Sequence, residues 1–359
     1  MKLLRFLETV ILASIGGGIF YYLHMPLPFI LGGLTFVALW QGLTKRKAYF
    51  PNLFRDFGFV ILGINFGLSF TKATFQTVSS YFFPYLLTTV LLIFISILIG
   101  FGISKRIGID PITSVFACIP GGMPEMTLAS KHLGGNDSYV AIFQTIRMVT
   151  VIFIVPALVT NIFPVFQPDS APVVTEASDA SPLHYLFYFI PISAAFLLKN
   201  RMPAGIIIGG LIVTALLNMG PFLIPPVPQT VTYLAQIFVG ASMGKTISIA
   251  DLMKGGKYGG YYLGASVIMI LVSLFSGFLL GAFTTLNYQT AILSTAPGGL
   301  FEMVLTASSI NGDPAIVSSL QLIRILVIVT VVPSALKWYF QRFYDKNVEK
   351  NYMRKTKCN

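Results

Sequence analysis

The sequence predicts an all-α polytopic membrane protein with two inverted repeats, each of about five transmembrane helices plus a re-entrant Pro-Gly-Gly hairpin. Three observations support this fold class. Hydrophobic residues make up 55% of the 359-residue chain and charged residues only 10%, against roughly a quarter in soluble domains. The chain resembles itself at a fixed offset. Its Lys and Arg residues gather in short loops and a tail, as membrane topology requires.

The internal repeat has an offset of 177 residues and needs no gap. It pairs Met25-Pro26 with Met202-Pro203, and Pro120-Gly121-Gly122 with Pro297-Gly298-Gly299. From Pro120 onward, 13 of 37 positions are identical in the two copies. Self-similarity over such a length indicates two copies of one structural unit.

The repeat also sets the domain boundaries. A first membrane repeat covers residues 1–163 and a second covers residues 183–340. Residues 164–182 between them are polar and rich in proline, without an apolar period, which is typical of a linker. Residues 341–359 form a basic tail.

Apolar runs predict helices in the first half over residues 6–23, 28–43, 56–71, 84–104 and 138–162. The first run imitates a signal peptide, but Glu8 interrupts it and no clear small-residue cleavage site follows. We therefore expect it to be a membrane helix. Residues 110–132 form a broken segment with two apolar arms of about eight residues. Each arm would reach only mid-membrane, at about 12 Å.

The broken segment is either one interrupted crossing or a re-entrant hairpin, and positive charge favours the hairpin. Cytoplasmic loops hold the excess of Lys and Arg. With a hairpin, each half has five crossings and both termini are cytoplasmic. The linker is then extracytoplasmic, and the basic loops at residues 45–47, 105–106, 199–201 and 254–257 all face the cytoplasm. An odd number of crossings orients the repeats oppositely, as in many secondary transporters.

Ionisable residues within membrane segments are candidates for function, because a charge at the bilayer centre costs about 2.5–3.5 kcal/mol on insertion scales. Four of them recur in the repeat: Glu125, Arg147, Glu302 and Arg324. Gln144 lies three residues before Arg147, and Gln321 three before Arg324. Each pair therefore shares one helix face, which we expect to look inward.

The glycines Gly121, Gly122, Gly298 and Gly299 free backbone groups at membrane depth. Such groups are tolerated only where they line a cavity or are buried in protein. The helix N-termini that follow would favour an anion. Under the inverted topology both tips meet near the midplane, and we expect the solute site there.

Two interpretations of the four charges stay open. In the structural one, Glu125 and Glu302 neutralise Arg147 and Arg324 and lock the hairpins to the helices. In the functional one, the arginines bind an anionic or zwitterionic solute, and a glutamate takes up a coupling proton because burial disfavours its charged form. Sodium coupling through freed carbonyls is the other option. We expect no further cofactor and no metal.

Spaced glycines recur in one helix of each half, as Gly63 and Gly67 and as Gly240 and Gly244. Close helix packing explains them best. Asn65 and Ser242, which lie between these glycines, are secondary cavity-lining candidates.

Two dipeptides, Asp110-Pro111 and Asp313-Pro314, have the pattern of a helix N-cap followed by proline at the first helical position. Asn287 stands where the offset places Asp110. We predict structural capping roles for all three side chains.

The doubled Pro-Gly-Gly-x-x-Glu-Met motif, with Gln-x-x-Arg and then Pro after it, resembles the AbrB-type family of bacterial membrane proteins over essentially the whole chain. The resemblance implies the bacterial inner membrane. Its members are labelled ammonia monooxygenase, regulator of gene expression or transporter. A copper oxygenase would need clustered His ligands, but His24, His132 and His184 lie apart and none repeats, so we expect no enzyme.

We expect an ion-coupled secondary transporter of a small anionic or zwitterionic solute. The main alternative is a membrane-embedded sensor that regulates gene expression without transport. The net charge of +11 lies in loops and the tail rather than in a folded module, which argues against nucleic acid. We expect the tail to contact anionic lipid headgroups. Association with further copies of the same chain, as a homo-oligomer, is also left open.

Overall fold

The computed structural model describes residues 2–163, 182–201, 204–220 and 224–344, and within them the chain is helical without strands. Five of the described helices are long and apolar enough to cross a membrane: α1 (Lys2–Tyr22), α4 (Lys72–Ile107), α7 (Asp137–Ile162), α12 (Gly256–Phe283) and α15 (Pro314–Tyr339). The predicted class of helical membrane protein is therefore confirmed. Of the predicted linker over residues 164–182, residues 164–181 lie outside the described residues, as do residues 345–359 of the predicted tail over residues 341–359.

The remaining helices are shorter: α2 (Pro28–Thr44), α3 (Asn52–Leu68), α5 (Pro111–Cys118), α6 (Met123–His132), α8 (Phe189–Leu198), α9 (Gly205–Met219), α10 (Gln229–Thr246), α11 (Ile249–Lys254), α13 (Tyr288–Thr295) and α14 (Leu300–Ser309). Helices α2, α3, α5, α6 and α7 begin 177 residues before α9, α10, α13, α14 and α15. The sequence offset therefore recurs in the secondary structure.

Helix α4 differs from its predicted bounds, because the segment expected from residue 84 begins at Lys72. The backbone N–H of Thr74 donates to the side chain of Thr71 at 3.2 Å, and the Thr74 hydroxyl accepts in return from the N–H of Thr71. Thr71 is therefore the N-cap of a capping box, and Lys72 is the first helical residue. Pro84 lies inside the helix rather than at its start.

The predicted caps are confirmed. The side chains of Asp110, Asp313 and Asn287 each accept a hydrogen bond from the backbone N–H three residues further on, at 2.9, 3.0 and 3.1 Å. They begin α5, α15 and α13 respectively. These hydrogen bonds satisfy N–H groups that a helix start leaves free.

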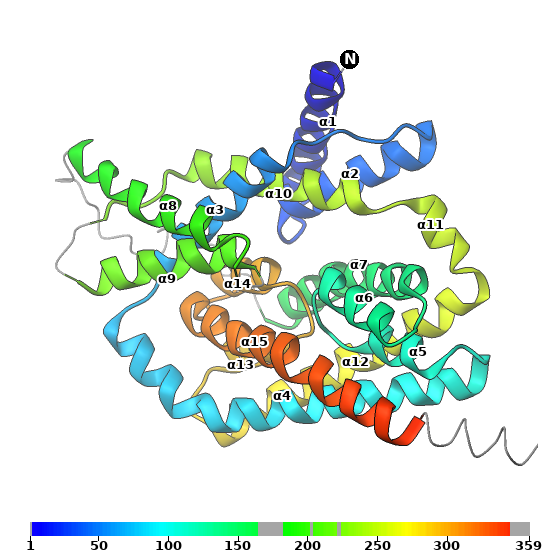
Figure 1. Ribbon diagram of the computed structural model, residues 1–359. Helices are drawn as coiled ribbons and strands as arrows, with labels where there is room; N and C mark the ends of the chain where they lie inside the picture. The colour runs from blue at the N-terminus through cyan, green and yellow to red at the C-terminus, as the bar shows by residue number, and fades with distance from the viewer. Residues whose placement is uncertain (1, 164–181, 202–203, 221–223, 345–359) are drawn as a thin grey trace, which may run out of the picture.

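The helices assort into two bundles, and each bundle draws helices from both halves of the sequence (Figure 1). We call α1–α3 with α8–α10 the crossing bundle. We call α4–α7 with α12–α15 the broken-helix bundle. Helix α11 leads from one to the other (Figure 1). The two sequence halves are thus interleaved in space.

Matching glycines hold the crossing bundle together, where α3 packs on α9 and α10 packs on α2. A Cβ on Gly63 would lie 2.7 Å from the carbonyl oxygen of Ile207. One on Gly240 would lie 2.6 Å from that of Ile30. These separations are too short for any side chain, so glycine is required at both crossings. The packing interpretation of the spaced glycines is confirmed.

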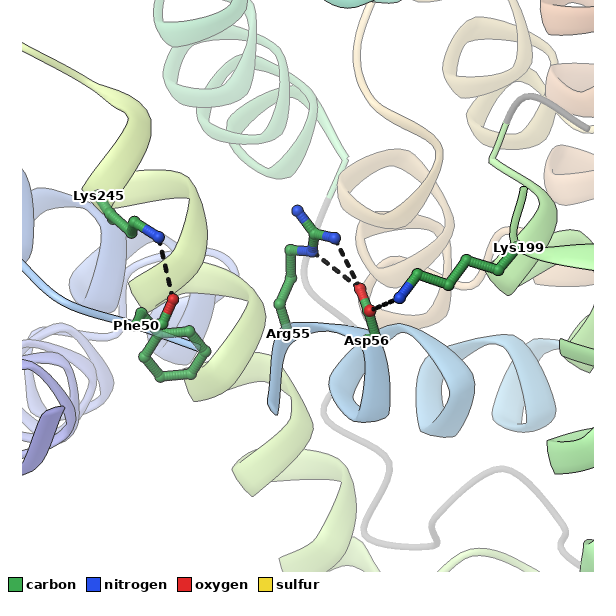
Figure 2. Close-up of polar contacts among 5 residues, drawn as sticks. All are labelled: Phe50, Arg55, Asp56, Lys199 and Lys245. Atoms are coloured by element: carbon green, nitrogen blue, oxygen red, sulfur yellow. Dashed lines mark hydrogen bonds and ion pairs between the residues drawn. The ribbon is translucent and has the colours of Figure 1, made fainter. Parts of the chain in front are cut away.

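A buried carboxylate joins the two halves within the crossing bundle (Figure 2). Asp56 in α3 has a side chain 2% exposed. Its Oδ1 lies 2.8 Å from Nη2 of Arg55, and its Oδ2 lies 2.5 Å from Nζ of Lys199 at the end of α8. Nearby, Lys245 Nζ donates to the carbonyl oxygen of Phe50 at 3.0 Å. Both lysines belong to the second half and both acceptors to the first.

Candidate functional site

Two loops interrupt helices at corresponding places, one between α5 and α6 and the other between α13 and α14. The predicted break at Pro120-Gly121-Gly122 therefore separates two short helices. The N-cap residues Gly122 and Gly299 have extended backbones, with φ of −64° and −71°. Each loop leaves backbone carbonyls without helical partners, and these need donors from elsewhere.

A glutamine from the following long helix supplies two of those donors. Gln144 Nε2 in α7 donates to the carbonyl oxygens of Phe116 and Ile119 at 2.7 and 2.9 Å. Gln321 Nε2 in α15 makes the same contacts 177 residues further on, at 2.8 and 3.3 Å. Each glutamine thus ties the C-terminal end of a short helix to a long one.

An arginine one turn later reaches the tip of each loop. Arg147 Nη2 donates to the carbonyl oxygen of Gly121 at 3.0 Å. Arg324 Nη2 donates to that of Gly298 at 2.9 Å. The shared glutamine and arginine face predicted from the spacing therefore points at the loop in both halves.

Arg324 makes more hydrogen bonds than Arg147 does. Arg324 Nη1 also donates to the carbonyl oxygens of Thr295, at 3.4 Å, and of Ala296. Its Nη2 additionally donates to Oε1 of Gln321. Arg324 is 4% exposed, and oxygen acceptors from its own half surround its two terminal nitrogens, while its Nε has no partner.

In the first half several buried polar atoms have no hydrogen-bond partner. On the face of Gln144 and Arg147 they are Nε and Nη1 of Arg147 and Oε1 of Gln144, whereas on the face of Gln321 and Arg324 only Nε of Arg324 is unpaired. Gln144 as a whole is 1% exposed. Native proteins leave few buried polar atoms unpaired, and those that remain need a physical reason.

The two glutamates lie at the third helical position of α6 and α14, close to the N-cap glycines. A Cβ on Gly122 or Gly299 would overlap Oε2 of Glu125 or Glu302. Negative charge is favourable at a helix N-terminus, so each carboxylate sits where the helix dipole stabilises it. No ion pair joins either glutamate to an arginine among the described residues. The arginines bind loop carbonyls instead.

A cavity of about 240 Å³ lies between the two loops. Both loops line it, and its polar lining side chains are Glu125, Gln144, Arg147 and Arg324. The other lining residues include Met123, Met148, Val151, Leu300, Ile325, Ile328 and Val329, and Ala204 from the crossing bundle. The predicted residues Glu302, Gln321, Asn65 and Ser242 do not line it. Amide, guanidinium and carboxylate groups of this kind bind charged solutes by hydrogen bonding and charge.

Ala204 and Asp56 are two positions that the sequence motifs left without a role. Ala204 follows Met202-Pro203, the copy of Met25-Pro26. Its place in the repeat could therefore have indicated that it matters. Its φ of 52° lies in the left-handed region, which is uncommon for a residue other than glycine. Asp56 has no acidic counterpart at the offset, and only its charge inside an apolar helix could have indicated it.

Metal ligands do not gather in the part of the chain that the structure describes, where no three His, Cys, Asp or Glu side chains come together. Loop backbone and the polar side chains of the cavity make up the candidate site.

Comparisons with known proteins match this chain over nearly its whole length. The family model described as "Transition state regulatory protein AbrB" matches residues 29–340, which include both loops. The chain is 23% identical over 357 residues to the uncharacterized protein YhjN of Bacillus subtilis (strain 168), with 92% of each chain covered. It is 22% identical over 346 residues to a protein of Escherichia coli (strain K12) provisionally named as a regulator, AbrB. That alignment covers 91% of this chain and 93% of the relative.

Proposed function

The chain belongs to the AbrB family, and we propose that it is an ion-coupled secondary transporter of a small anionic or zwitterionic solute. The proposed site is the cavity of about 240 Å³ between the two loops. One observation carries the proposal: two broken helices, one from each half, line a single cavity together with Arg147 and Arg324. Broken helices from two repeats form the solute sites of many secondary transporters.

The proposal includes an inverted topology in the inner membrane. Each repeat, over residues 1–163 and 183–340, has five crossings and one re-entrant hairpin, with both termini cytoplasmic and the linker extracytoplasmic. The lengths of α5 and α6, 8 and 10 residues, support the hairpin. At 1.5 Å per residue they span about 12 and 15 Å, roughly half of a 30 Å hydrocarbon core.

Movement between the two bundles would give access from either side. The site lies mostly in the broken-helix bundle, and Ala204 reaches it from the crossing bundle. Contacts between the bundles include the rings of Phe59 and Phe301, which stack with centroids 4.8 Å apart. An apolar contact of this kind can slide without breaking hydrogen bonds. Rocking of one bundle against another is a common route to alternating access.

Coupling would use a proton or sodium ion at the glutamates beside the loops, and the proposal contains no chemical reaction and no further cofactor. Glu302 supports a coupling role, because it is 1% exposed and its Oε2 has no hydrogen-bond partner. A carboxylate in such surroundings is stabilised by taking up a cation.

A sensor is the second candidate, since one relative is provisionally named as a regulator. Transport requires access to the site from both faces of the membrane, whereas sensing requires one. Val329→Cys places a thiol at the cavity, in a background with Cys118→Ala and Cys358→Ser. Val317→Cys is the matched control, because Val317 is fully buried in the core.

The experiment adds a membrane-impermeant thiol reagent to intact cells and to inside-out vesicles. A transporter gives labelling of Val329→Cys from both sides and none of Val317→Cys. Labelling of Val329→Cys from one side only would contradict transport and favour the sensor.

A further inference from the structure

The two glutamine and arginine faces are identical in sequence but differ in their hydrogen bonds. We infer that the face of Gln144 and Arg147 recognises the solute, while the face of Gln321 and Arg324 braces its loop. The recognised solute is a small carboxylate with a hydrogen-bond donor on the neighbouring carbon, a 2-amino or 2-hydroxy acid. This inference rests on the proposed function, because it assigns roles within the same cavity.

On the face of Gln321 and Arg324, most hydrogen-bonding groups are already paired within the protein. Both terminal nitrogens of Arg324 donate hydrogen bonds, Nη1 to the carbonyl oxygens of Thr295 and Ala296, and Nη2 to that of Gly298 and to Oε1 of Gln321. Only its Nε has no partner. To bind a solute, Arg324 would have to give up several of these contacts. The carbonyl oxygens of Thr295 and Gly298 would then lose this donor, and that of Ala296 would keep only Gln321 Nε2, which is unfavourable. Arg324 is thus suited to hold the loop in shape.

The face of Gln144 and Arg147 makes fewer hydrogen bonds within the protein. Arg147 donates one hydrogen bond, from Nη2 to Gly121, and its Nε and Nη1 have no partner. Oε1 of Gln144 is also unpaired, while Nε2 of the same side chain fixes the amide in place. Arg147 can therefore turn toward a solute at the loss of a single hydrogen bond, and it would gain partners for donors that now have none.

The cavity between the loops is the space that such a partner can enter. Arg147 also borders a void of about 10 Å³ together with Cys118, Phe143 and Tyr262. That void is at the lower limit for one water molecule. The cavity between the loops, at about 240 Å³, is larger than the roughly 150 Å³ cavity that accepts benzene. A solute with a short side chain therefore fits.

The chemistry of the unpaired atoms selects the solute class. The free N–H groups of Arg147 match a carboxylate. Oε1 of Gln144, one helical turn away, accepts a hydrogen bond, so the solute must also carry an N–H or O–H donor. Apolar walls from Met148, Val151 and Ile328 suit an aliphatic remainder. A carboxylate alone would leave the glutamine oxygen unpaired.

Four related compounds test this inference on the purified full-length protein: valine, 2-hydroxy-3-methylbutanoate, 3-methylbutanoate and valinamide. The measurement is the melting temperature with and without each compound, at concentrations up to about 10 mM, since a ligand of the folded state raises it. The protein variants are Arg147→Lys and the matched Arg324→Lys. Lysine keeps the charge but not the planar guanidinium.

We expect valine, the hydroxy acid or both to raise the melting temperature by at least about 2 °C. 3-Methylbutanoate, which lacks the donor, and valinamide, which lacks the carboxylate, should not. Arg147→Lys should lose the rise with little change in the ligand-free melting temperature. Arg324→Lys should lower the ligand-free value, and more than Arg147→Lys does.

Three results would overturn the inference: no rise with either acid, an equal rise with 3-methylbutanoate, or a rise lost only in Arg324→Lys. Binding is measured here without transport, so the proposed function can fail separately. A rise that depends on Arg147, in a protein that shows no uptake into vesicles, would leave the recognition face standing and contradict the transporter.

Discussion

Lys199 Nζ lies 2.5 Å from Oδ2 of Asp56, and this contact ties the second half of the chain to the first within the crossing bundle. Asp56 is buried, whereas the side chains of Arg55 and Lys199 are 34% and 35% exposed. Asp56→Asn removes the negative charge that both cations share. We expect a loss of about 2 kcal/mol in the free energy of unfolding, less than the 3–5 kcal/mol of a fully buried pair.

The control for Asp56 is an exposed ion pair on α6 and α7. Lys131 Nζ lies 3.1 Å from Oδ2 of Asp137, with side chains 67% and 39% exposed. Surface pairs contribute about 0–1 kcal/mol, so Asp137→Asn should change the melting temperature little. Equal effects of the two substitutions would contradict the structural role of Asp56.

The glycine crossings give a second prediction. Gly63→Ala and Gly240→Ala each place a Cβ within 2.7 Å of a backbone oxygen on the neighbouring helix. Backbone cannot yield as a side chain can, so both variants should lower the melting temperature and the yield of folded protein. Gly102→Ala in α4 is the matched control, because no atom lies within 4 Å of its added Cβ. Alanine there should be neutral or stabilising by up to about 1 kcal/mol.

The glutamines give a third prediction. Gln321→Leu removes two hydrogen bonds to carbonyls at the end of α13 and one of the four acceptors of Arg324. Gln144→Leu removes only the two carbonyl contacts. Unpaired buried polar groups cost about 1–3 kcal/mol each, so both variants should lose stability and Gln321→Leu should lose more. Gln76→Leu on the exposed side of α4 is the control. The reverse order of stability between the two loop variants would contradict the tighter bracing of the second loop.

The proposed inverted topology gives a fourth prediction. In a Cys358→Ser background, Ser178→Cys in the linker should react with an impermeant thiol reagent in intact cells. In the native sequence, Cys358 of the tail should react only after the cells are permeabilised. The other cysteine, Cys118, is buried and should stay unlabelled in both cases. Labelling of Ser178→Cys only after permeabilisation would contradict the inverted arrangement.

Sequence reasoning predicted the features that depend on local chemistry or on the repeat. The caps at Asp110 and Asp313, and the glycine crossings at Gly63 and Gly240, follow from residue type and spacing alone. Two features could not be predicted in this way. Helices from both halves mix in each bundle because packing, rather than chain order, decides which apolar faces meet. Helix α4 begins at a capping box of Thr71 and Thr74. In the sequence this pair is a weaker signal than Pro84, which suggested a later start.

The difference between the two arginines is also outside the reach of sequence. Arg147 and Arg324 occupy identical motifs, and a repeat predicts identical roles. Their hydrogen bonds nevertheless differ. In one half Gln321 accepts from Arg324, whereas Oε1 of Gln144 stays unpaired. Copies of one motif can therefore differ in their hydrogen bonds.

The most direct measurement is uptake of a mixture of 2-amino and 2-hydroxy carboxylic acids by vesicles that contain the purified protein. Lumenal contents are read by mass spectrometry, with and without an inward proton or sodium gradient. We predict gradient-dependent accumulation of one or a few of these acids, with none in vesicles containing Arg147→Lys. No accumulation under either gradient by folded, reconstituted wild-type protein would contradict transport of this solute class through the cavity between the two loops.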